Sequence, residues 1–199
     1  EERASAYFYR GYAKYDLKDF KGSLKDYTKA IDIDPNDEIA YYNRALTKYD
    51  LEDYIGSIED YTKAIKLDPN YSKAYYNRAF VKNTLEDHKG SLTDLDNAID
   101  IDPDDANAYY NRAISKDNLE DFQGAIEDYT KATDLNPNDA SAYYNRGISK
   151  DNLKDFQGAI EDYTKAIDID PEKVNAYINR GLIKDSLEDF QGAIEDYTK

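Results

Sequence analysis

Histidine and cysteine carry much of the catalytic and metal-binding chemistry of proteins, and this sequence almost lacks both. It contains no cysteine and a single histidine, His88. Disulfides, thiolate metal sites and any site that needs two imidazoles are therefore excluded. Aspartate and glutamate together number 42, so pairs of acids occur everywhere and do not indicate catalysis. We expect no enzymatic activity, no cofactor and no metal site.

Two other residue types recur at a spacing that suits peptide recognition. Asparagines form one series, at Asn43, Asn77, Asn111, Asn145 and Asn179. Aromatic residues directly precede this series, at Phe8 (before Tyr9), Tyr42, Tyr76, Tyr110 and Tyr144, with Ile178 in the last place. An asparagine amide can both donate to and accept from a peptide group, and a tyrosine ring offers a flat amphipathic surface. We predict that the asparagines and the aromatic residues bind a peptide. The alternative is that they contact neighbouring helices of the fold and were copied by duplication.

Four acids surround Pro103 in a way that resembles part of a calcium loop. They are Asp100, Asp102, Asp104 and Asp105. The glycine and the terminal glutamate that such a loop requires are absent at the necessary spacing. The ending and capping of helices explains these acids better. The chain consists of similar repeats, which are described below, and His88 occupies a position that holds Phe or Tyr in the other repeats. We therefore expect His88 to pack as a core or half-buried side chain.

The chain that carries these residues is a tandem repeat. Its prolines follow one another at intervals of 34 residues, at Pro35, Pro69, Pro103, Pro137 and Pro171. Six of the nine glycines keep the same interval, at Gly22, Gly56, Gly90, Gly124, Gly158 and Gly192. The repeats span residues 4–37, 38–71, 72–105, 106–139, 140–173 and an incomplete 174–199. Such a period is typical of a solenoid or another repeat architecture.

Each repeat has the pattern of two helices. In the second half of the fourth repeat, apolar residues from Phe122 to Tyr129 share one helical face. The first half, residues 107–119, contains no proline or glycine. A charged pair such as Glu120 and Asp121 separates the halves, and an Asp-Pro or Asn-Pro step disfavours helix at the end. The sequence therefore predicts two antiparallel helices per repeat.

One helix pair cannot bury its apolar face alone, so the repeats must stack and share a core. A small residue recurs where we expect two helix backbones to approach closely, at Gly11, Ala45, Ala79, Ala113, Gly147 and Gly181. We therefore expect a single all-α domain over residues 1–199.

The repeated residues resemble the motif of the tetratricopeptide repeat, or TPR. In the fourth repeat the characteristic aromatic, small and proline positions are held by Tyr109, Ala113, Ala125, Tyr129, Ala132 and Pro137. The resemblance covers nearly the whole chain. It implies a right-handed α-solenoid, or superhelix, of tandem helix-turn-helix repeats. It also implies a concave groove, lined by the first helices, that holds an extended peptide or a segment of another protein.

Two positions depart from the usual TPR pattern, because both carry positive charge in every repeat. At the position where TPR repeats commonly have leucine, this chain has Arg10, Arg44, Arg78, Arg112, Arg146 and Arg180. At the position where TPR repeats commonly have tyrosine, this chain has Lys14, Lys48, Lys82, Lys116, Lys150 and Lys184. The second helices carry Asp26, Asp60, Asp94, Asp128, Asp162 and Asp196. We predict that each arginine pairs with an aspartate across the helix interface, and the alternative is simple solvated charge.

The charge of the chain limits its partners. With 26 basic and 42 acidic residues the net charge is −16, which disfavours nucleic acid. Some TPR domains hold a terminal carboxylate with lysine and asparagine, but here the aromatic series occupies the lysine place, so we do not expect such a ligand. Acids follow the groove residues at Asp16, Asp50, Asp117, Asp151 and Asp185. They favour a neutral or basic ligand.

The sequence has neither a long apolar stretch nor a signal peptide, so we expect a soluble protein without membrane contact, with the cytoplasm favoured. The chain starts at Glu1 without an initiator methionine, so we expect an excised fragment or a processed product. The predicted function is a protein-binding scaffold. The alternative is end-to-end self-assembly into homo-oligomers, in which Ala193, Ile194 and Tyr197 pack against the Tyr7 end of another copy.

Overall fold

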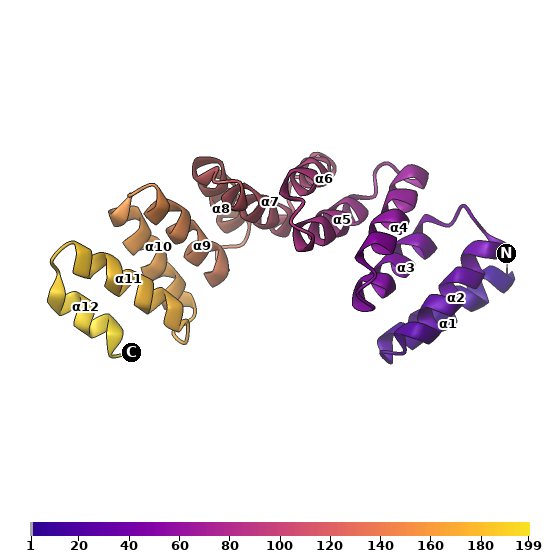
Figure 1. Cartoon of the computed structure of the whole chain (residues 1–199), viewed down its shortest axis with the longest axis horizontal. Coiled ribbons are helices and arrows are strands. Elements are labelled where there is room, and N and C mark those ends of the chain that lie inside the picture. The colour runs from indigo at the N-terminus through magenta and orange to yellow at the C-terminus, as the bar shows by residue number, and fades with distance from the viewer. Residues whose placement is uncertain (1) are drawn as a thin grey trace. The chain divides into compact units, whose positions relative to one another are not determined.

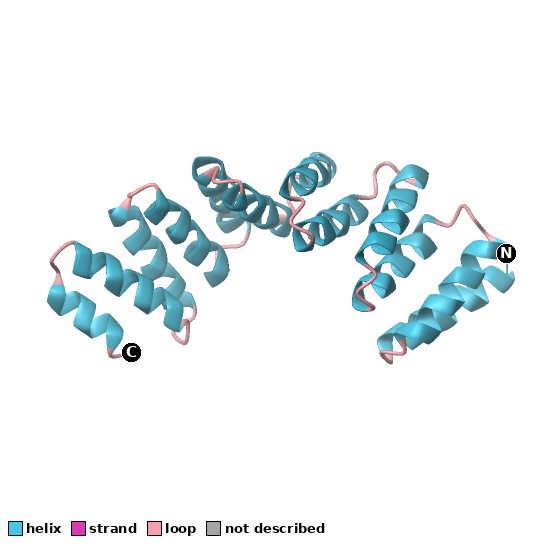
Figure 2. Ribbon diagram, in the orientation of Figure 1, coloured by secondary structure: helices cyan, strands magenta, loops and turns pink. Residues whose placement is uncertain are grey.

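The computed structural model describes residues 2–199, and within that range it contains twelve helices and no strand (Figures 1 and 2). This confirms the all-α prediction. The helices are α1 (Glu2–Asp16), α2 (Phe20–Ile33), α3 (Glu38–Asp50), α4 (Tyr54–Leu67), α5 (Ser72–Thr84), α6 (His88–Ile101), α7 (Ala106–Asn118), α8 (Phe122–Leu135), α9 (Ala140–Asn152), α10 (Phe156–Ile169), α11 (Val174–Ser186) and α12 (Phe190–Tyr197).

Consecutive helices form hairpins, and the hairpins group into two compact units. The first unit, Glu1–Pro103, contains α1 to α6, and the second, Asp104–Lys199, contains α7 to α12. Within each unit the second helix of a hairpin packs against the first helix of the next hairpin. Each hairpin occupies one of the repeats seen in the sequence. A single domain over residues 1–199 remains a prediction.

A charged pair forms the turn inside every hairpin. The first residue of the pair has a left-handed backbone, with a φ of 62° at Glu120, and the same holds at Lys18, Glu52, Glu86, Lys154 and Glu188. The second residue, Asp121, caps the following helix, because its Oδ1 accepts the backbone N–H of Gly124 at 3.1 Å. The backbone N–H of Asp121 also donates to the Lys116 carbonyl, at 2.9 Å. The pair therefore both reverses the chain and starts the second helix.

The small residue of the first helix faces a tyrosine ring of the same hairpin. Ala45 and Ala113 are fully buried at this place. A methyl group added to Gly147 would lie 2.7 Å from Cε1 of Tyr163. The need for a small residue is confirmed, but the expected reason was incomplete. The close neighbour is the aromatic ring of the second helix rather than a second backbone.

In four of the six hairpins the core is small and centred on a buried tyrosine. Tyr27, Tyr61, Tyr129 and Tyr163 are fully buried, and Leu95 takes the same place in the third hairpin. Buried alanines surround these rings, so each interface between helices is thin and close-packed. No helix within residues 2–199 is both long and apolar enough to span a bilayer.

Candidate functional site

One aspartate in each hairpin binds an arginine and a lysine of the first helix. Arg112 Nε and Nη2 donate to the two carboxylate oxygens of Asp128 at 2.8 and 2.7 Å, and Lys116 Nζ lies 2.7 Å from Oδ2. The Asp128 side chain is only 6 % exposed. The same arrangement surrounds Asp26, Asp60, Asp94, Asp162 and Asp196. The predicted arginine–aspartate pairs are confirmed in all six hairpins, and the alternative of solvated charge is wrong for all of them except the Arg10 side chain, which is 56 % exposed.

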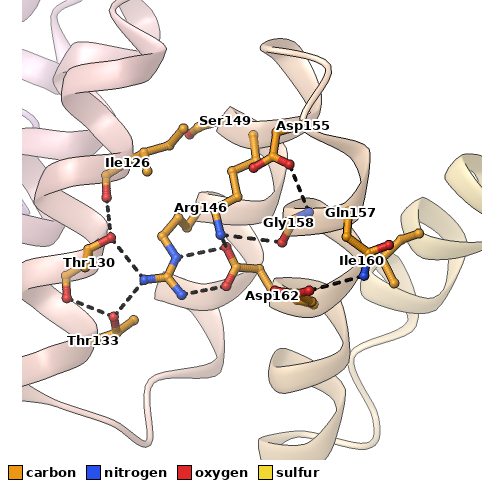
Figure 3. Close-up of polar contacts among 12 residues, drawn as sticks. Ile126, Thr130, Thr133, Arg146, Ser149, Asp155, Gln157, Gly158, Ile160 and Asp162 are labelled. Atoms are coloured by element: carbon orange, nitrogen blue, oxygen red, sulfur yellow. Dashed lines mark hydrogen bonds and ion pairs between the residues drawn. The ribbon is translucent and has the colours of Figure 1, made fainter.

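The arginine also joins its hairpin to the preceding one. Figure 3 shows Arg146 between Asp162 and two threonines of α8, Thr130 and Thr133, whose hydroxyl oxygens accept from Nη1 at 3.1 and 3.2 Å. Equivalent bonds join Arg44 to Thr28, Arg78 to Thr62 and Arg180 to Thr164. The six groups of arginine, lysine and aspartate, called the charge triads below, therefore stabilise their hairpins, and the four with these arginine–threonine bonds also stabilise the stacking of hairpins within a unit.

In the first and last charge triads the basic side chains lower the pKa of the aspartate. The hydrogen bond from Arg10 lowers the pKa of Asp26 to about 2, with a further contribution from Lys14. Burial acts to raise the pKa of Asp196, but hydrogen bonds from Arg180 and Lys184 outweigh it and the net shift is downward. Because these charges are satisfied within the hairpin, we assign the charge triads to the framework rather than to ligand binding.

Three asparagines of the predicted series bind a tyrosine of the preceding hairpin. Nδ2 of Asn77, Asn145 and Asn179 donates to the hydroxyl of Tyr42, Tyr110 and Tyr144, at 2.8, 2.9 and 3.2 Å. Asn43 and Asn111 instead donate to a carbonyl one turn earlier in their own helix. All five side chains are half-buried. The asparagine amides therefore make contacts within the fold, as the alternative expects.

The predicted aromatic series also packs within the fold. Ring centroids of Phe8, Tyr42, Tyr110 and Tyr144 lie 5.6, 5.7, 5.8 and 5.7 Å from the buried tyrosine of the same hairpin. These rings and Tyr76 are half-buried, whereas Ile178 is 42 % exposed. The structure thus brings the two series together along the first helices within each unit. Peptide binding by these residues remains a prediction.

In the first unit, a pocket of about 230 Å³ opens between α3 and α5. Its lining consists of Tyr15, Leu46, Tyr49, Asp50, Tyr61, Asn77, Phe80 and Val81. The Tyr15 hydroxyl donates to Oδ2 of Asp50 at 2.6 Å, so the one carboxylate in this lining is already paired. The pocket is mainly aromatic and aliphatic.

In the second unit, a pocket of about 270 Å³ opens between α7 and α9. Its lining consists of Ile114, Asp117, Asn118, Tyr129, Asn145 and Ile148. Every one of these residues lies two repeats beyond a lining residue of the first pocket, so the two pockets occupy the same place in their hairpins. They differ most at one position, where Asp117 replaces Tyr49. The second pocket is therefore more polar.

Asp117 is held by hydrogen bonds from two sides. Tyr129 Oη donates to Oδ2 at 2.9 Å, and Ser149 Oγ donates to Oδ1 at 2.7 Å. Burial raises the pKa of the Asp117 carboxyl above its usual value, against the effect of these two hydrogen bonds. In the next hairpin burial also raises the pKa of Asp151, yet the buried Tyr163 hydroxyl makes no hydrogen bond to any described residue.

The two pockets include residues that the sequence did not mark as binding residues. Tyr49 and Asn118 were not singled out, and Asp117 was expected only among the acids that follow the groove residues. The sequence spacing could have placed Asp117 and Asn118 in the pocket, because they follow Ile114 by three and four residues and so share its helix face. The hydrogen bond from Ser149 to Asp117 could not be predicted from local spacing, since it joins residues 32 positions apart.

The remaining candidates have structural roles. His88 is half-buried at the start of α6, with Nδ1 3.1 Å from Oδ1 of Asn83, as expected for a packing residue. Asp105 caps α7 by accepting the N–H of Asn107, and Asp102 is the C-cap of α6. Capping is therefore confirmed for these two acids. No group of metal-binding side chains occurs among residues 2–199.

The repeats match known family models. Models of the tetratricopeptide repeat match residues 39–71, 106–139 and 140–173, and further models described as TPR or tetratricopeptide repeats match residues 11–51, 60–91 and 174–199. The chain belongs to the tetratricopeptide repeat family. Members of this family typically mediate protein–protein interactions. No curated protein matches the sequence.

Several solved TPR structures are similar to this chain. The 41-end fragment of MamA from Desulfovibrio magneticus RS-1 is 24 % identical, with a TM-score of 0.82, over 87 % of this chain and 98 % of that chain. YrrB, described as a TPR protein with an unusual peptide-binding site, is 24 % identical, with a TM-score of 0.77, over 85 % and 88 % of the two chains. PilF of Pseudomonas aeruginosa is 17 % identical, with a TM-score of 0.82, over 98 % and 89 %. These similarities confirm the solenoid fold.

Proposed function

We propose that this TPR chain is a non-catalytic scaffold whose first helices bind an extended segment of another protein. One observation carries the proposal. In each unit a pocket lies between adjacent first helices, and a residue of the asparagine series, Asn77 or Asn145, forms part of its lining. A pocket beside an amide is suited to a peptide, because the side chain and the backbone of one ligand residue can be bound together.

The spacing of the repeats supports this arrangement. Packed helices lie about 10 Å apart, and an extended chain advances about 3.3 Å per residue. Every third ligand residue would therefore meet another asparagine. Asn145 donates one N–H to Tyr110, which holds the amide in place. The amide also has a second N–H and an oxygen with which to pair a peptide group.

The charge of the chain supports a neutral or basic ligand. The net charge is −16, and acids of the first helices lie beside or within the pocket linings, as Asp50 and Asp117 do. An acidic surface speeds association with basic partners and disfavours acidic ones.

Replacing both Asn111 and Asn145 with alanine tests the scaffold. Partners would be crosslinked and captured from native extract, and binding would then be measured on a peptide array and by calorimetry. We expect the double variant to lose capture while its far-ultraviolet circular dichroism stays unchanged. Asn175→Ala, at an exposed position of α11, is the matched control and should retain capture. Undiminished affinity in the double variant would contradict the proposal.

A second candidate function is end-to-end self-assembly. Phe190, Ile194 and Tyr197 of α12 are 59, 56 and 49 % exposed. The equivalent residues of α10 are half-buried or, for Tyr163, fully buried. Such an apolar face could pack against the first hairpin of another copy. Light scattering over a concentration series tests this: assembly should rise with concentration and disappear in Ile194→Asp, whereas a constant monomer mass would exclude it.

A further inference from the structure

We propose that the pocket between α7 and α9 receives a lysine side chain of the bound segment, with Asp117 as the opposing charge. The inference rests on the function proposed above and specifies one ligand side chain. It concerns the second unit alone. The pocket, the carboxylate and the apolar walls each contribute a separate argument.

The first argument is the state of the carboxylate. Tyr129 and Ser149 each donate one hydrogen bond, to different oxygens of Asp117. A carboxylate has about four lone-pair sites, so acceptor capacity remains for an ammonium group. The nearest cation in sequence, Lys116, is bound to Asp128 instead. Asp121 adds further negative charge near Asp117. The site therefore holds a negative charge that no basic side chain of a charge triad neutralises.

The second argument is the partial burial of Asp117. Burial disfavours the ionised carboxylate, as the raised pKa of Asp117 reflects. A cation that enters the pocket offsets this cost, and its attraction is stronger there than in bulk water. An apolar or neutral ligand side chain would instead bury the carboxylate further without compensation.

The third argument is the shape and the lining. Ile114 and Ile148 provide apolar walls for the methylene stem of a lysine, which can pack along apolar surface while its ammonium reaches a polar group. Asn118 and Asn145 add amide oxygens that can accept from the ammonium. A pocket of about 270 Å³ leaves room for such a side chain.

The pocket of the first unit provides an internal control. There Tyr49 replaces Asp117, Phe80 replaces Ile148, and the single carboxylate, Asp50, lies at an exposed position where water weakens its attraction for a cation. This lining favours an apolar ligand side chain. A preference for lysine should therefore appear around α7 and α9 and be absent around α3 and α5.

Three blocked tripeptides with the same flanking alanines test the inference. Their central residue is lysine, acetyl-lysine or norleucine, and binding to the full chain is followed by ¹H–¹⁵N NMR. We expect the lysine peptide to shift the amides of Asp117 and Asn118 and to bind at least about tenfold more tightly than the other two, a factor that corresponds to about 1.4 kcal/mol. Equal affinities for the three peptides, or no shift with lysine, would overturn the inference.

Variants of the chain test whether Asp117 causes the preference for the lysine peptide. Asp117→Asn should abolish the preference for lysine, whereas Asp50→Asn, in the first unit, should leave it unchanged. Asn118→Asp adds a second carboxylate at an exposed position and should strengthen the preference, which keeps the inference testable if Asp117→Asn does not fold. Failure of these tests leaves the capture experiment with Asn111 and Asn145 unaffected, so the two proposals can fail separately.

Discussion

The pockets of the two units occupy equivalent places in the repeat yet differ in chemistry. Between α3 and α5 the lining is dominated by Tyr49, Tyr61 and Phe80, and between α7 and α9 the corresponding lining contains Asp117. The charge triads of the same hairpins, around Asp60 and Asp128, have the same geometry in both units. The comparison teaches that the framework sets where a pocket forms, and that one or two exchangeable positions per repeat set what it can bind.

Removal of the framework arginine in each unit should have the largest effect. Arg44→Ala and Arg146→Ala each leave a buried aspartate without its bidentate partner, and we expect each to lower the free energy of unfolding by about 3 kcal/mol. Urea denaturation followed by circular dichroism measures this loss. Lys66→Ala and Lys165→Ala, at exposed positions, should change it by less than about 0.5 kcal/mol. If only one of the two arginine variants lost much unfolding free energy, the charge triads of the two units would not contribute equally to stability.

A smaller effect should separate two tyrosines of the second unit. Tyr129 donates to the Asp117 carboxylate, whereas the buried Tyr163 hydroxyl has no partner among the described residues. We expect Tyr129→Phe to cost about 1.5 to 3 kcal/mol, and Tyr163→Phe to cost nothing or to stabilise by about 1 kcal/mol. Thermal unfolding of the two variants gives the comparison. Equal losses would mean that the bond to Asp117 contributes nothing specific.

Acid should affect the carboxylates Asp26 and Asp117 in opposite ways. The pKa of Asp26 is lowered from 3.8 to about 2 by Arg10, so its contribution to stability is present above pH 3.8 and lost as the pH falls toward 2. Burial raises the pKa of Asp117 above 3.8, so its favourable contribution is present below pH 3.8 and lost as the pH rises through the raised pKa. Carbon-13 NMR of the two carboxyl groups measures both titrations. Titration of both groups at the same pH would contradict the assignment.

The turns of the two units should give the smallest effect. Glu52 and Glu120 have φ values of 63° and 62°, a region that costs about 1 to 2 kcal/mol for residues other than glycine. Glycine relieves this strain but makes the unfolded chain more flexible, so we expect Glu52→Gly and Glu120→Gly to stabilise by about 1 kcal/mol or less. The matched controls Glu59→Gly and Glu127→Gly, on exposed helix positions, should destabilise by about 1 kcal/mol. Differential scanning calorimetry measures the stability of these variants. Destabilisation by Glu52→Gly or Glu120→Gly would contradict the prediction.

Much of the framework could be predicted from the sequence because it depends on short-range order. The interval between prolines predicted the hairpins, and opposite charges at fixed places predicted the pair of Arg112 and Asp128, which lie 16 residues apart in one hairpin. The bond from Asn145 to Tyr110 spans 35 residues and two hairpins. Residue types alone did not distinguish that contact from a ligand-binding role, since the same amide suits both.

The sequence by itself determined the helices, their turns and the placement of one charge triad in each hairpin, because these follow from the local periodicity and chemistry of a single repeat. Only the tertiary structure decided which first-helix side chains meet across neighbouring hairpins. Ser149 of α9 donates to Asp117 of α7, and Asn145 of α9 donates to Tyr110 of α7. Such contacts depend on how closely two packed helices approach, because a hydrogen bond weakens steeply as its geometry departs from the ideal.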